Sequence, residues 1–197
     1  TLNDDTRWQA AWAFKDHGKS WDAVYKREHP AGFRWVHESF GTNGRITEMQ
    51  SAIGRIQLRR MPEWRAARAR NAENILTTCE TFAALRTPRP SAHLAHAWYK
   101  CYVFVRPEKL AKGWDRDRIV AAIDAEGVPC YTGSCSEVYL EKAFEGTGFQ
   151  PKRRLPHAKL LGETSLMFLV HPTLKEEEIK KTCRVIEKVM RQASAAV

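Results

Sequence analysis

The sequence predicts an α/β protein, mainly because of the order of elements in its second half. After residue 87, segments rich in aromatic and β-branched residues alternate with amphipathic segments in the order β-α-β-α-α-β-α. This order is typical of a sheet covered by helices. Residues 1–86 show helical periodicity and loops instead, and we expect no strand there. The Pro-rich break at residues 87–91 separates the two patterns and is the predicted domain boundary.

The first predicted helix begins close to the N-terminus. Asp4 or Asp5 can cap it, because a carboxylate accepts hydrogen bonds from the free backbone donors of a first helical turn. Trp8 and Trp12 follow at helical spacing, and we interpret this aromatic stripe as core. The helix should end near Gly18.

A long loop and a long helical region complete the first part. Residues 19–44 carry little periodicity and are predicted to be a structured loop, which in compact proteins is often functional. Thr47 and Gln50 match a capping box and should start the next helix. Pro62 lacks a backbone donor, so it should kink this helix or start a second one that runs to Phe82.

The second part carries the predicted strands. They are expected at residues 98–105, 128–131 and 165–170. Asp115 should cap the helix after the first strand, and Gly127 should end it. A short helix is expected near residues 137–144, and Pro156 suits the first turn of another. Residues 173–176 match a capping box that opens a terminal helix.

Composition indicates a globular protein with a core. Of 197 residues, 43% are hydrophobic and 28% are charged, which excludes a disordered tail or a low-complexity linker. No apolar run approaches the roughly 20 residues that span a bilayer, so we expect no membrane partner. The five cysteines form no CxxC pair, and the seven histidines show no paired-ligand spacing. We therefore expect reduced thiols in a cytoplasmic protein and no metal site.

The net charge suggests an anionic partner. Lys and Arg number 32 against 23 Asp and Glu, a formal charge of +9. The basic residues are spread along the chain, with one concentration at residues 55–70 that has the spacing of a solvated helix face. A nucleic-acid partner is therefore not expected, and a site for a phosphorylated or nucleotide-linked anion fits the same charge at least as well.

The most specific motif is GTNGRITEMQSAIG at residues 41–54. It resembles the signature G-x-N-x-R-(M/I)-T-E-(M/L)-Q-A-A-I-G of the DegT/DnrJ/StrS family of pyridoxal-phosphate-dependent aminotransferases, which make amino sugars. Other family segments follow this resemblance in order along the chain. They are KDHG at 15–18, HAWY at 96–99, GVP at 127–129 and LVHPTL at 169–174.

This resemblance implies a C-terminal portion of a fold-type I pyridoxal-phosphate-dependent transferase. Residues 1–86 would be the remainder of the large cofactor-binding domain with its connecting helices, and residues 87–197 the complete small α/β domain. The implied cofactor is pyridoxal 5'-phosphate. The implied assembly is a homodimer with active sites at the subunit interface. The implied reaction moves an amino group from an amino acid, typically glutamate, to a keto sugar that is often nucleotide-linked, or to a related cyclic ketone.

Four residues are candidates for the binding site by the same resemblance. Asn43 would contact the cofactor phosphate of the neighbouring subunit, since a carboxamide donates to a phosphate oxygen without adding charge. Arg45 would bind a substrate phosphate or carboxylate, or hold its own loop through an ion pair. His96 and Tyr131 are candidate substrate contacts. The plainer alternatives are an ordinary turn at Asn43, a satisfied polar residue at His96 and a packing role for Tyr131.

No catalytic residue is assigned within the chain. In this family the Schiff-base lysine precedes a Gly-rich T-G-E-G-G turn, and Thr1 is expected to fall just after that turn. Transamination needs this lysine, so these residues alone should be inactive. The alternatives are a catalytically inactive paralogue that serves as a binding or dimerisation partner and, less favoured, a basic nucleic-acid-binding module.

Overall fold

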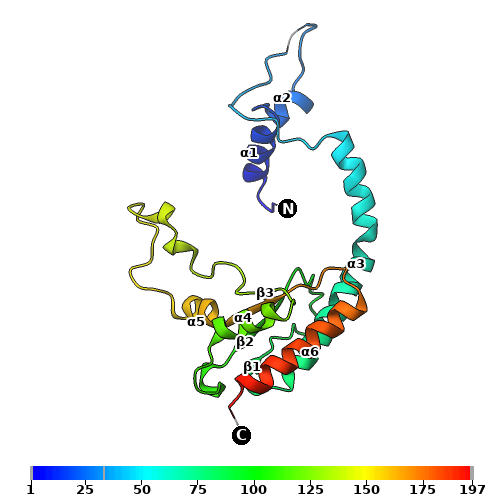
Figure 1. The fold of residues 1–197 in the computed structure, drawn as a ribbon. Helices are drawn as coiled ribbons and strands as arrows, with labels where there is room; N and C mark the ends of the chain where they lie inside the picture. The colour runs from blue at the N-terminus through cyan, green and yellow to red at the C-terminus, as the bar shows by residue number, and fades with distance from the viewer. Residues whose placement is uncertain (1, 33, 196–197) are drawn as a thin grey trace. The chain divides into compact units, whose positions relative to one another are not determined.

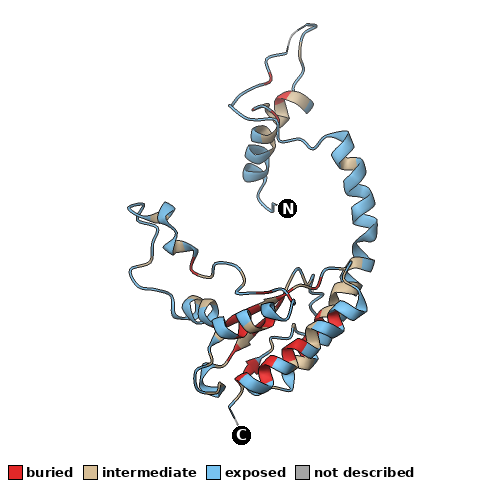
Figure 2. Cartoon of the chain, in the orientation of Figure 1, coloured by how far each residue is buried: buried red, intermediate tan, exposed pale blue. Residues whose placement is uncertain are grey.

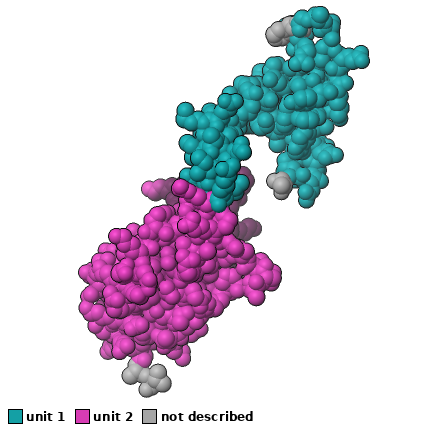
Figure 3. All heavy atoms as spheres, turned by 90° about the vertical axis from the view of Figure 1, so that its right-hand side faces the viewer, with its two compact units in different colours: residues 1–59 teal, residues 60–197 magenta. Residues whose placement is uncertain are grey.

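The chain forms two compact units in the computed structural model, residues 1–59 and residues 60–197 (Figure 3). The structure describes residues 2–32 and 34–195. Thr1, which the resemblance places just after the Gly-rich turn, lies outside these ranges. The division between the units falls inside helix α3 (Glu48–Glu80). The domain boundary after residue 86 that the sequence suggests stays a prediction.

Helix α1 (Asp5–Lys15) begins at the predicted cap. The side chain of Asp4 accepts a hydrogen bond from a backbone N–H of the first turn at 2.8 Å. Trp8 and Trp12 pack edge-on against Trp21, with ring centroids 5.0 and 5.1 Å apart. The prediction that these two rings are core is wrong, because the rings cover one another only in part. None of the residues of α1 is buried, and Trp8 is 37% exposed.

The segment predicted as one long loop contains a short helix, α2 (Trp21–Tyr25). Ser20 caps it, since its hydroxyl accepts a hydrogen bond from the backbone N–H of Ala23 at 3.3 Å. Five residues are too few for the helical period to stand out in the sequence, which is why α2 escaped prediction. The remaining described residues, 26–32 and 34–44, are irregular as expected, apart from single-residue bridges.

Helix α3 begins with the predicted capping box. The backbone N–H of Thr47 donates to Gln50 Oε1 at 3.0 Å, and the N–H of Gln50 donates to Thr47 Oγ1 at 3.2 Å. The idea that Pro62 starts a second helix is wrong, because one helix of 33 residues continues through it. Proline removes only one donor from the helical ladder, and so long a helix retains many others on both sides.

The two parts of α3 differ in burial (Figure 2). Its first part leaves the apolar side chains of Met49, Ile53 and Ile56 exposed by 76%, 53% and 51%. The second part, within unit 2, buries one side against the core. The buried residues are Ala72, Ile75, Leu76 and Cys79.

Unit 2 is built on a four-stranded antiparallel sheet in the order β1-β2-β4-β3. Its strands are β1 (Leu85–Arg86), β2 (Cys101–Val105), β3 (Cys130–Tyr131) and β4 (Ser165–Phe168). Strands β2, β3 and β4 lie within the predicted segments but are shorter. The expectation of no strand before residue 87 is wrong because of β1, whose two residues are too few to show alternation.

Two of the helices of unit 2 begin at predicted residues, and one of them also ends where predicted. In α4 (Arg116–Ala125), Asp115 accepts a hydrogen bond from a first-turn N–H at 2.7 Å. Gly127, with φ of +70°, follows the end of this helix, where a left-handed residue favours glycine. Helix α5 (Pro156–Thr164) starts at Pro156 as predicted.

Two other predictions need correction. The capping box of α6 (Glu176–Ala193) is not at residues 173–176, because the helix begins later: the N–H of Lys175 donates to Glu178 Oε2 at 2.7 Å. The short helix expected near residues 137–144 is instead two 3-10 turns, Val138–Leu140 and Lys142–Phe144. Glu141 has an extended conformation, with ψ of 139°, between the two turns and so interrupts the helix.

The core lies between one face of the sheet and the helices α3, α4 and α6 (Figures 1 and 2). Alternate residues of β2 are buried, and the register places Cys101 beside Phe168 and Val103 beside Leu166 on this face. The sheet positions Tyr102 on its other, half-exposed face.

All five cysteines are free thiols. Burial raises the pKa of both Cys101 and Cys130 to about 12, so these two remain protonated at neutral pH. Within the described residues, no helix combines the length and hydrophobicity needed to cross a bilayer.

Candidate functional site

The most constrained part of unit 1 is a crossing of two segments, residues 14–18 after α1 and residues 39–44 before α3. We call this the unit 1 crossing. The backbone N–H of Thr42 donates to the carbonyl of Phe14 at 2.7 Å, and further backbone hydrogen bonds of 2.9 and 3.1 Å join the same segments. The crossing thus fixes the part of the family-like motif that precedes α3.

Two glycines allow the segments to approach so closely. Gly18 has φ of +87°, and a Cβ atom added there would lie 1.8 Å from the carbonyl oxygen of Ser39. A Cβ atom on Gly41 would lie 2.5 Å from the backbone nitrogen of Gly18. Both distances are far below van der Waals contact, so only glycine fits at either position.

Asn43 and Arg45 meet at this crossing. Arg45 Nε donates to Asn43 Oδ1 at 3.1 Å, and the backbone N–H of Arg45 lies 3.4 Å from the same oxygen. The amide nitrogen of Asn43 has no hydrogen-bond partner among the described residues. Since its oxygen is held by Arg45, the side chain presents a free, uncharged donor.

Arg45 also contacts His17 and Asp16, two residues of the KDHG segment for which the sequence predicts no role. One of its terminal nitrogens lies 3.3 Å from His17 Nε2, and another lies 3.6 Å from Asp16 Oδ1. His17 has φ of +61°, an uncommon conformation for a residue other than glycine. Strained backbone of this kind is concentrated at functional sites.

Asp16 is one of the few buried polar residues, with 8% of its surface exposed. Burial alone would raise the pKa of its carboxyl group. The positive charges of Lys19, 3.4 Å away, and of Arg45 outweigh this effect, so the pKa of Asp16 is lower than its ordinary value. The carboxylate therefore stays charged at neutral pH and helps to anchor Arg45.

This pairing should make the stability of unit 1 depend on pH. A carboxylate with a lowered folded-state pKa stabilises the fold above the unfolded-chain pKa of about 3.9, and the contribution is lost as the pH falls through the folded-state pKa. We expect Asp16→Asn to lower the free energy of unfolding at pH 7 but much less at pH 3, measured by urea denaturation at both values. An equal loss at both pH values would contradict the assignment.

His96 lies in unit 2, at a cavity of about 290 Å³ that Trp98, Lys100 and Tyr102 also line. Its Nδ1 accepts a hydrogen bond from the backbone N–H of Trp98 at 3.0 Å, and the two rings lie 4.4 Å apart. Trp98 has φ of +49°, and Arg68 donates to its carbonyl oxygen at 3.3 Å. One nitrogen of His96 is thus satisfied locally, and the other faces no described partner.

Tyr131 ends the short strand β3 and is 48% exposed. The chain that follows it leads into a cavity of about 490 Å³ between residues 132–141 and residues 154–163. Ser134 links this region to the sheet, since its backbone N–H donates to the hydroxyl of Tyr102 at 3.2 Å.

The structure brings Asn43 and Arg45 into direct contact, whereas His96 and Tyr131 belong to unit 2. His96 lines the cavity of about 290 Å³, and Tyr131 is not part of the lining of either cavity. Sequence reasoning missed Glu137 and Arg154, which form an ion pair across the loop after β3. They lie 17 residues apart in irregular chain, so no spacing rule could connect them.

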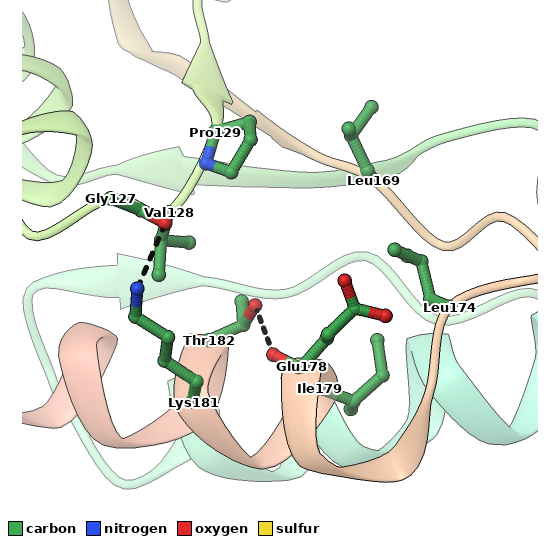
Figure 4. A pocket seen from close by; sticks show the side chains of 9 residues that line it. All are labelled: Gly127, Val128, Pro129, Leu169, Leu174, Glu178, Ile179, Lys181 and Thr182. Atoms are coloured by element: carbon green, nitrogen blue, oxygen red, sulfur yellow. Dashed lines mark hydrogen bonds between the residues drawn. The ribbon is translucent and has the colours of Figure 1, made fainter.

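Another cavity, of about 260 Å³, contains none of the candidate residues (Figure 4). It lies over the start of α6 and is lined by both apolar and polar residues. The amine of Lys181 donates to the carbonyl of Gly127 at 3.1 Å, and the Thr182 hydroxyl donates to the carbonyl of Glu178 at 2.9 Å. These polar groups are already engaged, so the cavity offers little chemistry. Among the described residues, no three His, Cys, Asp or Glu side chains could hold a metal ion.

Comparison with known proteins gives the family. The profile of the DegT/DnrJ/EryC1/StrS aminotransferase family matches residues 1–189. A dTDP-3-amino-3,4,6-trideoxy-alpha-D-glucose transaminase of Streptomyces venezuelae is 27% identical over 167 residues, which cover 85% of this chain and 41% of that protein.

Solved structures of aminotransferases have a fold similar to that of this chain. An aminotransferase from Psychrobacter cryohalolentis is 56% identical, with a TM-score of 0.88 over 97% of this chain and 50% of its own. The aminotransferase TlmJ from Streptoalloteichus hindustanus, at 20% identity, shares the fold with a TM-score of 0.74 over 96% of this chain and 46% of its own.

The chain thus spans about half the length of these relatives, and the expected fold, a C-terminal part of a pyridoxal-phosphate-dependent transferase, is confirmed. The matched family profile covers nearly the whole sequence, so the chain belongs to the DegT/DnrJ/EryC1/StrS family of aminotransferases, which depend on pyridoxal 5'-phosphate.

Proposed function

We propose that this chain is the C-terminal part of a cytoplasmic aminotransferase that moves an amino group from an amino acid, glutamate in our assignment, to a keto sugar or a related cyclic ketone. Family membership supports the reaction class. The Streptomyces relative, which is named as a sugar-nucleotide transaminase, supports a sugar acceptor. The proposed assembly is a homodimer with active sites at the subunit interface.

The observation that carries this proposal is the free amide of Asn43. Its oxygen is fixed by Arg45, and the close crossing at Gly18 and Gly41 fixes the backbone around it. A neutral N–H donor next to a guanidinium group suits a phosphate, because both groups hydrogen-bond to its oxygens. These residues therefore fit the cofactor phosphate, which we propose belongs to the site of the neighbouring subunit.

Pyridoxal 5'-phosphate would supply the electron sink that amino-group transfer needs. Asn43 would bind and orient its phosphate. Arg45, whose side chain is 49% exposed, would hold Asn43 and offer its remaining N–H groups to a substrate carboxylate or phosphate. His96 and Tyr131 are proposed as acceptor contacts from unit 2. The lysine that binds the cofactor is expected outside these 197 residues.

Two substitutions of Asn43 in the full-length enzyme test the phosphate assignment. Asn43→Ala removes the donor, and we expect about a 10- to 100-fold weaker affinity for pyridoxal 5'-phosphate, the effect of losing one hydrogen bond to a charged group. Asn43→Asp keeps an oxygen that Arg45 can bind but replaces the donor with a negative charge, so its affinity should fall further. Absorbance titration with the cofactor measures both.

Asn3→Ala is the matched control, since Asn3 is exposed and has no side-chain hydrogen bond among the described residues. Its affinity for the cofactor should equal that of the wild type. If Asn43 only holds the loop, Asn43→Asp will bind the cofactor as well as the wild type does, and the phosphate assignment is then wrong.

A further inference from the structure

Residues 132–155, between β3 and α5, form a long irregular loop that extends away from the sheet (yellow-green in Figure 1). We call it the 132–155 loop. It contains only the two 3-10 turns, and its apolar side chains are largely exposed, with Phe149 80% and Leu140 51% accessible. A loop of this length without a hydrophobic core needs another source of order.

A buried carboxylate supplies that order. Glu137 is 8% exposed, and its Oε1 accepts hydrogen bonds from the hydroxyl of Tyr139 at 2.5 Å and from Arg154 Nε at 2.9 Å. A terminal nitrogen of Arg154 binds the other oxygen. The hydroxyl of Tyr139 in turn accepts a hydrogen bond from the backbone N–H of Leu155 at 2.9 Å. This network joins the first residues of the loop to its last.

The charge of Glu137 is well stabilised. The hydrogen bond from Arg154, and then the one from Tyr139, lower the pKa of Glu137 to about 2. The carboxylate is therefore ionised throughout the physiological range, so its attraction to Arg154 does not depend on pH there.

The first end of the loop is also fixed to the sheet and to α5. The Ser165 hydroxyl donates to the carbonyl of Thr132 at 2.5 Å. A Cβ atom on Gly162 would lie 2.3 Å from Ser136 Oγ, so the loop and α5 touch where glycine leaves room. The loop therefore leaves the sheet at a defined place, directly after Tyr131.

Glu137 and Arg154 also line the cavity of about 490 Å³, one from each of its two walls. The first wall adds the hydroxyls of Thr132, Ser134 and Ser136. The second wall belongs to the end of the loop and to α5. The ion pair joins the two walls together with the hydrogen bond between Tyr139 and Leu155 and the contact between Ser136 and Gly162, so it helps to set the shape of the cavity.

We propose that Glu137 is a positioning residue, which acts with Arg154 and Tyr139 to hold the two walls of a polar subsite for the sugar acceptor. The hydroxyls of the first wall would hydrogen-bond to the hydroxyl groups of the ligand. This inference rests on the proposed sugar aminotransferase function and adds the residues that shape its acceptor site. Glu137 itself need not touch the reacting atoms.

The test uses the full-length enzyme with Glu137→Gln, which keeps the side-chain size but loses the charge. Trypsin reports the order of the loop, because Lys142, Lys152 and Arg153 are exposed within it. Binding of dTDP-glucose, measured by calorimetry, reports the subsite; this probe is chosen because the Streptomyces relative is named for a dTDP-linked glucose derivative. The half-reaction with L-glutamate reports the remainder of the active site.

We expect Glu137→Gln to be cleaved in the loop about tenfold faster and to bind dTDP-glucose about tenfold more weakly, as for the loss of one charge-assisted hydrogen bond. Its rate with glutamate should stay within about twofold of the wild-type rate. Arg154→Lys, which retains the charge but not the fork of donors, should show a smaller change in both measurements. Glu145→Gln is the matched control, with an exposed carboxylate in the same loop, and should behave as the wild type.

Three outcomes would overturn the inference. Unchanged cleavage of Glu137→Gln would show that the network does not hold the loop. Faster cleavage with unchanged dTDP-glucose binding would show a role in loop stability alone. A wild-type enzyme that does not bind dTDP-glucose would exclude a subsite for this ligand. The titrations of the Asn43 variants report the cofactor site separately, so a failure of the proposed function can be told apart from a failure at Glu137.

Discussion

Replacement of Phe168 by alanine should lower the free energy of unfolding of unit 2 by about 3–5 kcal/mol, the usual cost of removing a buried aromatic ring. Phe168 is 1% exposed and is among the largest fully buried side chains of the core. It lies on the central strand β4, paired in register with Cys101 on one side and Cys130 on the other. Its loss would leave a cavity where three strands meet the helices.

Urea denaturation followed by circular dichroism measures this effect. Phe149→Ala is the matched control, because Phe149 is 80% exposed in the 132–155 loop, and its change should stay within about 0.5 kcal/mol. A loss below about 1 kcal/mol for Phe168→Ala would show that the core relaxes around the gap, contrary to the close packing of protein interiors.

Replacement of Gly18 by alanine should open the unit 1 crossing and weaken cofactor binding by more than about tenfold. The added methyl group would meet the carbonyl oxygen of Ser39 at 1.8 Å, and the φ of +87° is itself strained for alanine, by about 1–3 kcal/mol. The backbone at residues 39–44 must therefore move. Asn43 moves with it, and the orientation of its amide is lost.

Gly44→Ala provides the control for this prediction. A Cβ atom there would lie 3.5 Å from Lys15 Cβ, an ordinary contact, and Gly44 is not among the residues with positive φ. Absorbance titration with pyridoxal 5'-phosphate should give a clearly lower cofactor affinity for Gly18→Ala than for Gly44→Ala. Equal affinities would mean that the crossing does not position the cofactor-binding residues.

Much of the fold could be predicted because the signals are local. Asp4, Thr47 and Asp115 cap helices where the sequence places them, since a cap is recognised within four residues. Strand β2 follows from its aromatic and β-branched run, and strand β4 follows from its short apolar run. The family motif at residues 41–54 also led correctly to the family.

The features that the sequence did not predict depend on contacts between residues that are distant along the chain. Strand β1 exists because Leu85 pairs with Val105, and two residues carry no pattern of their own. The contact between Arg45 and His17 spans 28 residues and needs the crossing to form first. The exposure of Trp8 could not be read from its helical spacing, because periodicity shows which residues share a face but not what covers that face.

The two edge strands of the sheet are very short, and this affects how the chain behaves at high concentration. The outer strands, β1 and β3, have two residues each, so they offer very few unpaired backbone groups to an incoming strand. Any precipitate that the folded chain forms should therefore be amorphous and should not bind thioflavin T, because fibrils need longer strands on which to grow.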